Sequence, residues 1–255
     1  LKHDLLKRNL FGRVIAYTYV VEFQKRGLPH VHMLLILHSS DKMYSADAYD
    51  RIVKAEIPSY AENPVLHDLV KKHMLHGPCG KLNKKNICMQ KGDTCSNGYP
   101  KPFCDNTTAI DNAYPLYLRR CDGVTAYARG HFLDNRWVVS YNPYLLLKYD
   151  CHINVEICAT VQSIKYIYKY ICKGHDRIHF RGHDGRSQTE IDEIGDYQAG
   201  RWVSPPEAAW RIFVFPLSEI KPAVIHLQLH LENHQYIHFN ARQQLANVLR
   251  NPLNK

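Results

Sequence analysis

The pattern of hydrophobic and polar positions near the start of the chain predicts an antiparallel hairpin. Residues 11–21 (FGRVIAYTYVV) are rich in β-branched and aromatic side chains, which favour a strand. A polar turn containing Gly27 and Pro29 follows, and residues 33–37 (MLLIL) are then apolar without alternation. An uninterrupted apolar run is typical of a strand that is covered on both faces. We therefore expect residues 11–37 to form a hairpin with a buried second strand.

The remaining elements have weaker patterns. Helical patterns occur in residues 41–56 and 163–173, and residues 191–215 suggest two short helices, of which Ser204 or Pro205 opens the second. Residues 135–140 and 151–159 resemble strands, and residues 224–238 alternate well enough for a further strand or hairpin. The chain has no internal repeat and no low-complexity segment.

Two histidines stand at the start of the second predicted strand. His30 and His32 are two residues apart, so strand alternation sends both side chains to the same face. Adjacent imidazoles are unusual in a buried sheet unless a partner satisfies them. A metal ion is one such partner, because neutral imidazole is a common metal ligand.

Three tyrosines lie within five residues of the segment 163–173, SIKYIYKYICK. In a helix, Tyr166 and Tyr170 would be one turn apart on one face, while Tyr168 would lie beside an isoleucine stripe and belong to the core. Lysines repeat at the same interval beside the pair, at positions 165, 169 and 173. One interpretation is a surface helix with solvated lysines. The other is a pair of nucleophilic phenols, whose poor reactivity at neutral pH would require a metal and nearby positive charge.

A cysteine-rich segment predicts a structural zinc site. Four of the eight cysteines fall within the 26 residues from Cys79 to Cys104, in a stretch with little periodic apolar pattern. One histidine and three thiolates are a usual tetrahedral zinc set, and we predict the ligands His76, Cys79, Cys88 and Cys95. Cys104 is then spare, and His73 or His67 is an alternative to His76. Free thiols in a reduced loop are the competing interpretation, but a loop without an apolar core favours zinc, which can supply folding energy.

The bulk composition argues against a membrane-spanning protein and favours a protein that binds a polyanion. No run of 18 apolar residues occurs, so no membrane span is expected, and the N-terminus is not a signal peptide. The net charge of +9 fits a protein that binds a polyanion such as nucleic acid. We take an intracellular protein as the working assumption, because the cysteines cluster without a secretory signal.

These motifs together resemble the Rep nuclease region of Helitron transposases, a group of two-tyrosine HUH endonucleases. The segments EFQKRGLPHVHMLLIL, HGPCG, YPKPF, YNPYLLLKYDCHINVEIC, IKYIYKYICKGHD and GRWVSPPEAAWRIFVFPL occur there in the same order. The resemblance covers most of the chain, from about Phe11 onward. It implies an α+β fold over residues 1–255, with a central antiparallel sheet of about five strands flanked by helices. It also implies a zinc-stapled insertion over residues 66–107.

The resemblance assigns roles residue by residue. His30 and His32 become ligands of a divalent ion, Mg²⁺ or Mn²⁺, with Gln24 as the candidate third ligand and Glu22 as the alternative. Glu22 has the harder oxygen donor for Mg²⁺. Tyr166 and Tyr170 become paired nucleophiles that cut single-stranded DNA through a 5′-phosphotyrosine link. His152, Asn154 and Glu156 are expected on one strand face. They either supply a metal ligand, or support one by hydrogen bonding, or form an ordinary polar face. Four basic residues are candidates for contacts with phosphate: Lys25, Arg26, Lys169 and Lys173.

The resemblance also implies context for the chain. Helitron transposases carry a helicase after the nuclease, yet this sequence has no phosphate-binding glycine-rich loop and begins without methionine. We therefore expect the nuclease portion of a longer nuclear protein, without ATP hydrolysis. Three alternatives stay open. They are a rolling-circle replication initiator of a phage, virus or plasmid, a non-catalytic zinc-dependent DNA-binding module, and a metal hydrolase that uses water.

Overall fold

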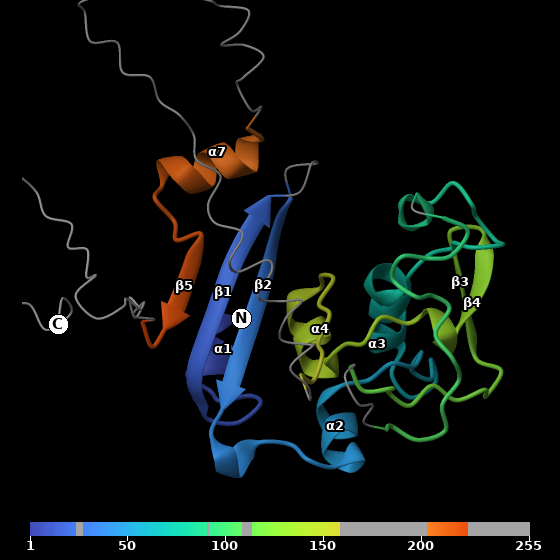
Figure 1. Ribbon diagram of the computed structural model, residues 1–255. Coiled ribbons are helices and arrows are strands. Elements are labelled where there is room, and N and C mark those ends of the chain that lie inside the picture. The colour runs from blue at the N-terminus through green and yellow to red at the C-terminus, as the bar shows by residue number, and fades with distance from the viewer. Residues whose placement is uncertain (24–27, 91, 109–113, 159–202, 224–255) are drawn as a thin grey trace, which may run out of the picture. The chain divides into compact units, whose positions relative to one another are not determined.

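The computed structural model describes residues 1–23, 28–90, 92–108, 114–158 and 203–223 (Figure 1). One compact unit comprises Leu1–Lys221, and Pro222–Lys255 forms a second, of which Pro222 and Ala223 are described. Among the described residues, no helix has the length and apolarity needed to cross a membrane. The helices are α1 (Lys2–Leu6), α2 (Ala46–Ile52), α3 (Pro64–Leu69), α4 (Pro143–Tyr149) and α7 (Pro205–Ile212). The strands are β1 (Val14–Phe23), β2 (Pro29–Leu37), β3 (Thr125–Ala128), β4 (His131–Asp134) and β5 (Ser218–Lys221).

The predicted N-terminal hairpin is confirmed. Strands β1 and β2 pair antiparallel, and β5 joins the other edge of β1, so that the order is β2-β1-β5. The register sets Glu22 opposite His30 and Val20 opposite His32. Side chains that face each other across an antiparallel pair share one face of the sheet, so both histidines and Glu22 lie on the same face.

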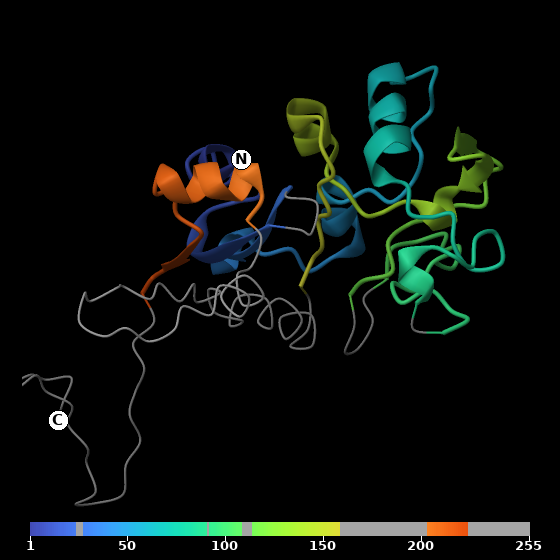
Figure 2. The same ribbon diagram turned by 90° about the horizontal axis from the view of Figure 1, so that it is seen from above.

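The opposite face of this sheet carries two helices. Trp210 of α7 packs edge to face on Phe23, with ring centroids 6.0 Å apart, and Lys2 of α1 lies over the rings of Tyr17 and Tyr19. These three β1 residues alternate with Thr18 and Glu22 along the strand. Figure 2 shows α1 and α7 over this face. The histidine face is therefore the one that neither of these helices covers.

The expectation of a fully buried second strand is wrong for the described part of the chain. Every residue of β2 keeps some exposure, and Val31 and Ile36 are 40% and 44% exposed. An apolar run can therefore form a strand of a sheet that is only partly buried. Such a run does not show whether one or both faces of the strand are covered.

Helix starts follow from their capping residues. α3 and α4 begin alike, with an asparagine followed by proline: Asn63 Oδ1 accepts from the Leu66 N–H at 3.0 Å, and Asn142 Oδ1 accepts from the Leu145 N–H at 3.0 Å. Asparagine satisfies a free N–H at such a terminus, and proline there loses no helical hydrogen bond. The predicted opening of a helix at Ser204 and Pro205 is confirmed, with Ser204 at the cap and Pro205 first in α7.

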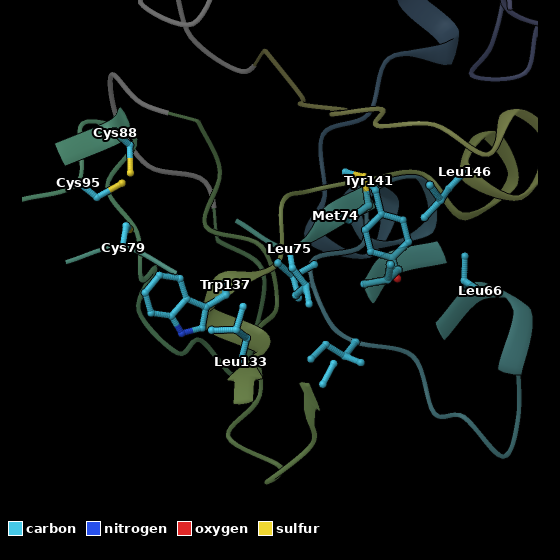
Figure 3. Packing of buried hydrophobic residues seen from close by; sticks show 14 of the residues in the cluster. Leu66, Met74, Leu75, Cys79, Cys88, Cys95, Leu133, Trp137, Tyr141 and Leu146 are labelled. Atoms are coloured by element: carbon cyan, nitrogen blue, oxygen red, sulfur yellow. The ribbon is translucent and has the colours of Figure 1, made fainter. Parts of the chain in front are cut away.

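The main hydrophobic core lies in the middle of the chain, between the cysteine-rich segment and α4. It contains fully buried Met74, Leu133, Val138 and Leu146, and it continues into the three cysteines of the predicted zinc site (Figure 3). Trp137 is 6% exposed and lies between this apolar group and Cys79 in Figure 3. The cysteines are therefore one end of the core.

Two predicted strands are wrong. Residues 135–140 form a 3₁₀ turn at Asn135–Trp137, and residues 151–158 have no strand assignment. Residues 137–139 make only isolated backbone pairs, in which the Val139 N–H donates to the Met74 carbonyl at 2.7 Å and the Trp137 carbonyl accepts from the His76 N–H at 2.8 Å. Side chains supply further partners in this segment. Buried Asn135 accepts from the Ile57 N–H at 2.8 Å, and the Arg119 guanidinium donates to the carbonyls of Asn135 and Val138 at 2.8 and 2.6 Å. A single-sequence pattern does not reveal such long-range partners.

The described residues show both helices and antiparallel sheets, but not the expected sheet of about five strands. They contain the three-stranded sheet and a separate two-stranded hairpin, β3–β4. The predictions for residues 163–173, for the first helix of 191–215, and for 224–238 fall outside the described residues.

Candidate metal centres

The structure brings together the four residues predicted to bind zinc. One ligand atom each from His76, Cys79, Cys88 and Cys95 lies within 4.8 Å of the others, and Cys95 Sγ is 3.3 Å from His76 Nε2. All three cysteines are buried free thiols. One imidazole and three sulfurs are a donor set that suits tetrahedral zinc. This cluster could therefore bind Zn²⁺.

Local backbone features around Gly77 place these ligands. Gly77 has φ of +91°, and a Cβ at this position would lie 2.9 Å from Cζ3 of Trp137. Only glycine combines a left-handed φ with such close approach. The His76 N–H donates to the Trp137 carbonyl at 2.8 Å, and the Arg129 guanidinium donates to the carbonyls of Leu75, at 3.1 Å, and of Gly77. The histidine is thus held from both sides in the chain.

The electrostatics of the cluster differ among its members. Burial and the neighbouring thiols raise the pKa of Cys79 to about 12, and burial likewise raises the pKa of Cys88. Burial also opposes ionisation of Cys95, but hydrogen bonds from backbone N–H groups and from the other thiols lower its pKa below the ordinary value. Three thiolates together would need a cation to offset their charge, and zinc supplies it.

The imidazole of His76 is suited to binding metal in its neutral form. Burial lowers its pKa, and the positive charges of Arg129 and Lys101 lower it further. Its ring stacks on Tyr99 with centroids 4.2 Å apart and planes at 18°. Sequence reasoning missed both Tyr99 and Arg129 as residues that position the ligand. Tyr99 begins the YPKPF segment, but nothing in the sequence spacing indicates that its ring stacks on His76.

The alternative ligands lie elsewhere. His67 Nδ1 is 2.9 Å from the Pro58 carbonyl, and His73 Nε2 is 2.7 Å from Asp150 Oδ1. Cys104 donates to the Asn106 carbonyl at 2.6 Å and pairs by a backbone bridge with Arg119. The structure therefore favours His76 as the fourth member, and it leaves Cys104 outside the cluster.

The second candidate centre is the histidine face of the hairpin. The rings of His30 and His32 have centroids 4.6 Å apart, and His32 Nε2 is 3.9 Å from Glu22 Oε2. Burial lowers the pKa of both imidazoles, and for His30 the nearby His32 and His152 lower it further while Glu22 opposes the change. Two neutral imidazoles and a carboxylate form a donor set that fits a divalent ion.

The remaining predicted site residues divide into two groups. His152 donates from Nδ1 to the His73 carbonyl at 2.8 Å, while Ser140 Oγ lies 2.9 Å from Asn154 Oδ1 and within hydrogen-bond reach of Glu156. Residues 152, 154 and 156 therefore do not form the expected strand face, and two of them converge on Ser140, which sequence reasoning did not single out. The others lie outside the described residues: Gln24, Lys25, Arg26, Tyr166, Lys169, Tyr170 and Lys173.

Comparison with known proteins bears on the hairpin. Residues 1–35 match a Helitron domain. The family is described as the Helitron helicase-like domain at the N-terminus, and the matched part includes β1, most of β2, and Glu22, His30 and His32. A search of curated proteins finds no match to this chain. The chain is thus similar to this Helitron domain over the segment that carries the histidine face.

Proposed function

We propose that this chain is a metal-dependent, single-stranded DNA endonuclease and strand transferase of the Helitron type. The observation that carries the proposal is the histidine face, where His30, His32 and Glu22 gather on one side of a hairpin within the Helitron match. A bound Mg²⁺ or Mn²⁺ would polarise a scissile phosphate and stabilise its developing charge. Neutral imidazoles support this role, because a protonated ring has no lone pair for a metal.

The chain's own nucleophiles would be Tyr166 and Tyr170. The oxygen of one tyrosine attacks phosphorus in line as its proton leaves, and the bond from phosphorus to the 3′-oxygen breaks. The departing 3′-oxygen takes up a proton, so the products are a 5′-phosphotyrosine and a free 3′-hydroxyl. The second tyrosine allows a further cleavage or transfer before the first product leaves. Lys169 and Lys173, close to the pair in sequence, and Lys25 and Arg26, in the sequence between β1 and β2, would hold phosphates without reading the base sequence.

A denaturing gel with labelled single-stranded DNA tests the proposal. With Mn²⁺ we expect a protein–DNA band that resists SDS, and with EDTA we expect none. The double variant Tyr166→Phe/Tyr170→Phe should lose the band, whereas Tyr168→Phe, a matched change in the same segment, should keep it. His30→Ala/His32→Ala should also lose it.

The other outcomes separate the competing functions. DNA cleavage without a covalent band would favour water as the nucleophile and contradict the role of the tyrosines. Binding without cleavage or adduct, over several DNA sequences, would favour the zinc-dependent DNA-binding module.

A further inference from the structure

The loop between the second and third members of the zinc cluster is strongly basic. Residues 80–87 (GKLNKKNI), here called the lysine loop, join Cys79 to Cys88. Lys81, Lys84 and Lys85 are all exposed, and no acidic residue occurs between Asp68 and Asp93. Three like charges within five residues repel one another and do not help the loop to fold.

The ends of this loop are fixed to each other. Asn86 donates its side-chain amide to the Pro78 carbonyl at 2.7 Å, and the Gly80 N–H lies 3.2 Å from the sulfur of Met89. Within the loop, the Lys85 N–H donates to Asn83 Oδ1 at 3.0 Å. Cys79 and Cys88, which flank the loop, both belong to the cluster. A metal that joins the two thiolates would therefore close the base of the loop and limit its shape.

In the part of the chain that the structure describes, the charges of the three loop lysines are not neutralised by carboxylates, in contrast to those of two lysines elsewhere in the chain. Lys72 and Lys148 form ion pairs with Asp150 and Asp4 at 2.9 and 2.6 Å. Within the described residues, none of the three loop lysines makes a salt bridge. The wider segment 66–107 holds seven lysines against three aspartates, with no arginine or glutamate. Positive charge is thus concentrated here and left available to an external polyanion.

We propose that the lysine loop binds the phosphodiester backbone of a nucleic acid, and that zinc in the adjacent cluster holds the loop in its binding form. Lysine ammonium groups are compact point charges that contact phosphates without reading bases. The lysine loop shares no residue with the histidine face or with the predicted tyrosine pair, and the proposal makes no use of their chemistry. It gives the cysteine-rich insertion a function in retaining the DNA strand.

The test measures DNA binding without cleavage. The parent protein is Tyr166→Phe/Tyr170→Phe with no added Mg²⁺ or Mn²⁺, and the probe is an oligo-dT strand titrated at several salt concentrations. In Lys81→Ala/Lys84→Ala/Lys85→Ala, the slope of log K against log salt should become shallower by about 2, since each phosphate contact to a single strand contributes roughly 0.7. The affinity at about 0.1 M salt should fall roughly ten- to hundredfold. The control is Lys7→Ala/Lys42→Ala/Lys54→Ala, which removes three exposed lysines elsewhere and should leave the slope near that of the parent.

Zinc removal supplies the second arm. Parent protein stripped of zinc should bind as weakly as the loop variant, and stripping the loop variant should weaken it little more. Equal zinc content and circular dichroism in both triple variants will exclude a folding defect. A loop variant with the slope and affinity of the control would overturn the proposal, as would zinc-free protein that binds like the parent. Loop-dependent binding to anionic phospholipid vesicles, with no effect on oligo-dT or on a duplex of equal length, would likewise overturn it.

Failure of this proposal and failure of the proposed nuclease are distinguishable. If the loop matters for binding but no covalent adduct forms, the nuclease proposal fails alone. If the adduct forms and the loop variant binds like the control, the lysine loop proposal fails alone.

Discussion

Glu22 lies directly opposite His30 across the β1–β2 pair, and its carboxylate reaches to 3.9 Å from Nε2 of His32 on the same face. Among the described residues, Glu22 thus places a carboxylate close to both histidines. Gln24, the other candidate third ligand, lies outside the described residues. The geometry therefore supports Glu22 as the third ligand.

We predict that Glu22→Gln weakens Mn²⁺ binding by about tenfold or more, because a neutral amide replaces a charged oxygen donor at nearly constant shape. Gln24→Ala should change the affinity by much less. Isothermal titration of Mn²⁺ into protein already loaded with zinc measures both. The reverse order, with Gln24→Ala the damaging change, would assign the third ligand to Gln24.

The zinc cluster predicts a contrast among cysteines. Serine at Cys79, Cys88 or Cys95 should abolish the binding of one zinc ion per chain and lower the free energy of unfolding by about 3 kcal/mol or more, since structural zinc contributes on the order of 10 kcal/mol to small folds. Cys104→Ser should leave the zinc content unchanged, because Cys104 is outside the cluster. Elemental analysis with chemical denaturation checks this. Absence of zinc from carefully purified wild-type protein would show that these four residues do not form a zinc site.

Asp4 predicts an acid-sensitive contribution to stability. Its side chain is 3% exposed and accepts hydrogen bonds from Lys148, at 2.6 Å, and from Tyr149, and these lower its pKa to about 2. The unfolded carboxyl keeps its ordinary value of 3.8. The folded state therefore gains from the ionised carboxylate above pH of about 4 and loses this gain as the pH falls towards about 2.

Asp4→Asn should accordingly be less stable than wild type at neutral pH, and the difference should shrink below pH of about 4. Denaturation midpoints measured across this range provide the check. A difference that stays constant with pH would mean that packing, and not charge, makes Asp4 important.

Val214 predicts a stabilising substitution. It follows α7 with φ of +55° and is 84% exposed, so that a β-branched residue occupies a left-handed position at a helix end. This conformation costs an L-residue roughly 1–2 kcal/mol, while glycine loses about 0.5–1 kcal/mol in chain entropy. Val214→Gly should thus stabilise the protein by up to about 1 kcal/mol, and Val214→Ala should not. Thermal melts of the two variants decide the matter, and a destabilised glycine variant would contradict the inferred strain.

The features that depend on local spacing could be predicted from the sequence. Strand alternation placed His30 and His32 on one face, and the register adds Glu22 opposite them. The composition of the cysteine-rich segment identified the four cluster members. In both cases the chemistry needs residues at short intervals, which a single sequence displays.

The features that sequence reasoning missed or left open depend on distant partners. Whether His67, His73 or His76 joins the cysteines is decided by contacts with Pro58, with Asp150, and with Trp137 and Tyr99, none of which spacing reveals. Residues 135–140 have a strand-like composition, yet the carbonyls of Asn135 and Val138 accept from the distant Arg119 guanidinium, and the Asn135 side chain accepts from the Ile57 N–H. The exposure of β2 likewise depends on what packs over the sheet, which the apolar run does not encode.

The most direct test of the nuclease proposal is to locate the DNA on the protein. Protein incubated with Mn²⁺ and single-stranded DNA would be treated with nuclease, digested with protease and analysed by mass spectrometry. The account predicts a residual nucleotide joined through phosphate to Tyr166 or Tyr170, absent in EDTA and absent in His30→Ala/His32→Ala. A nucleotide on any other residue, or cleaved DNA with no modified peptide, would contradict it.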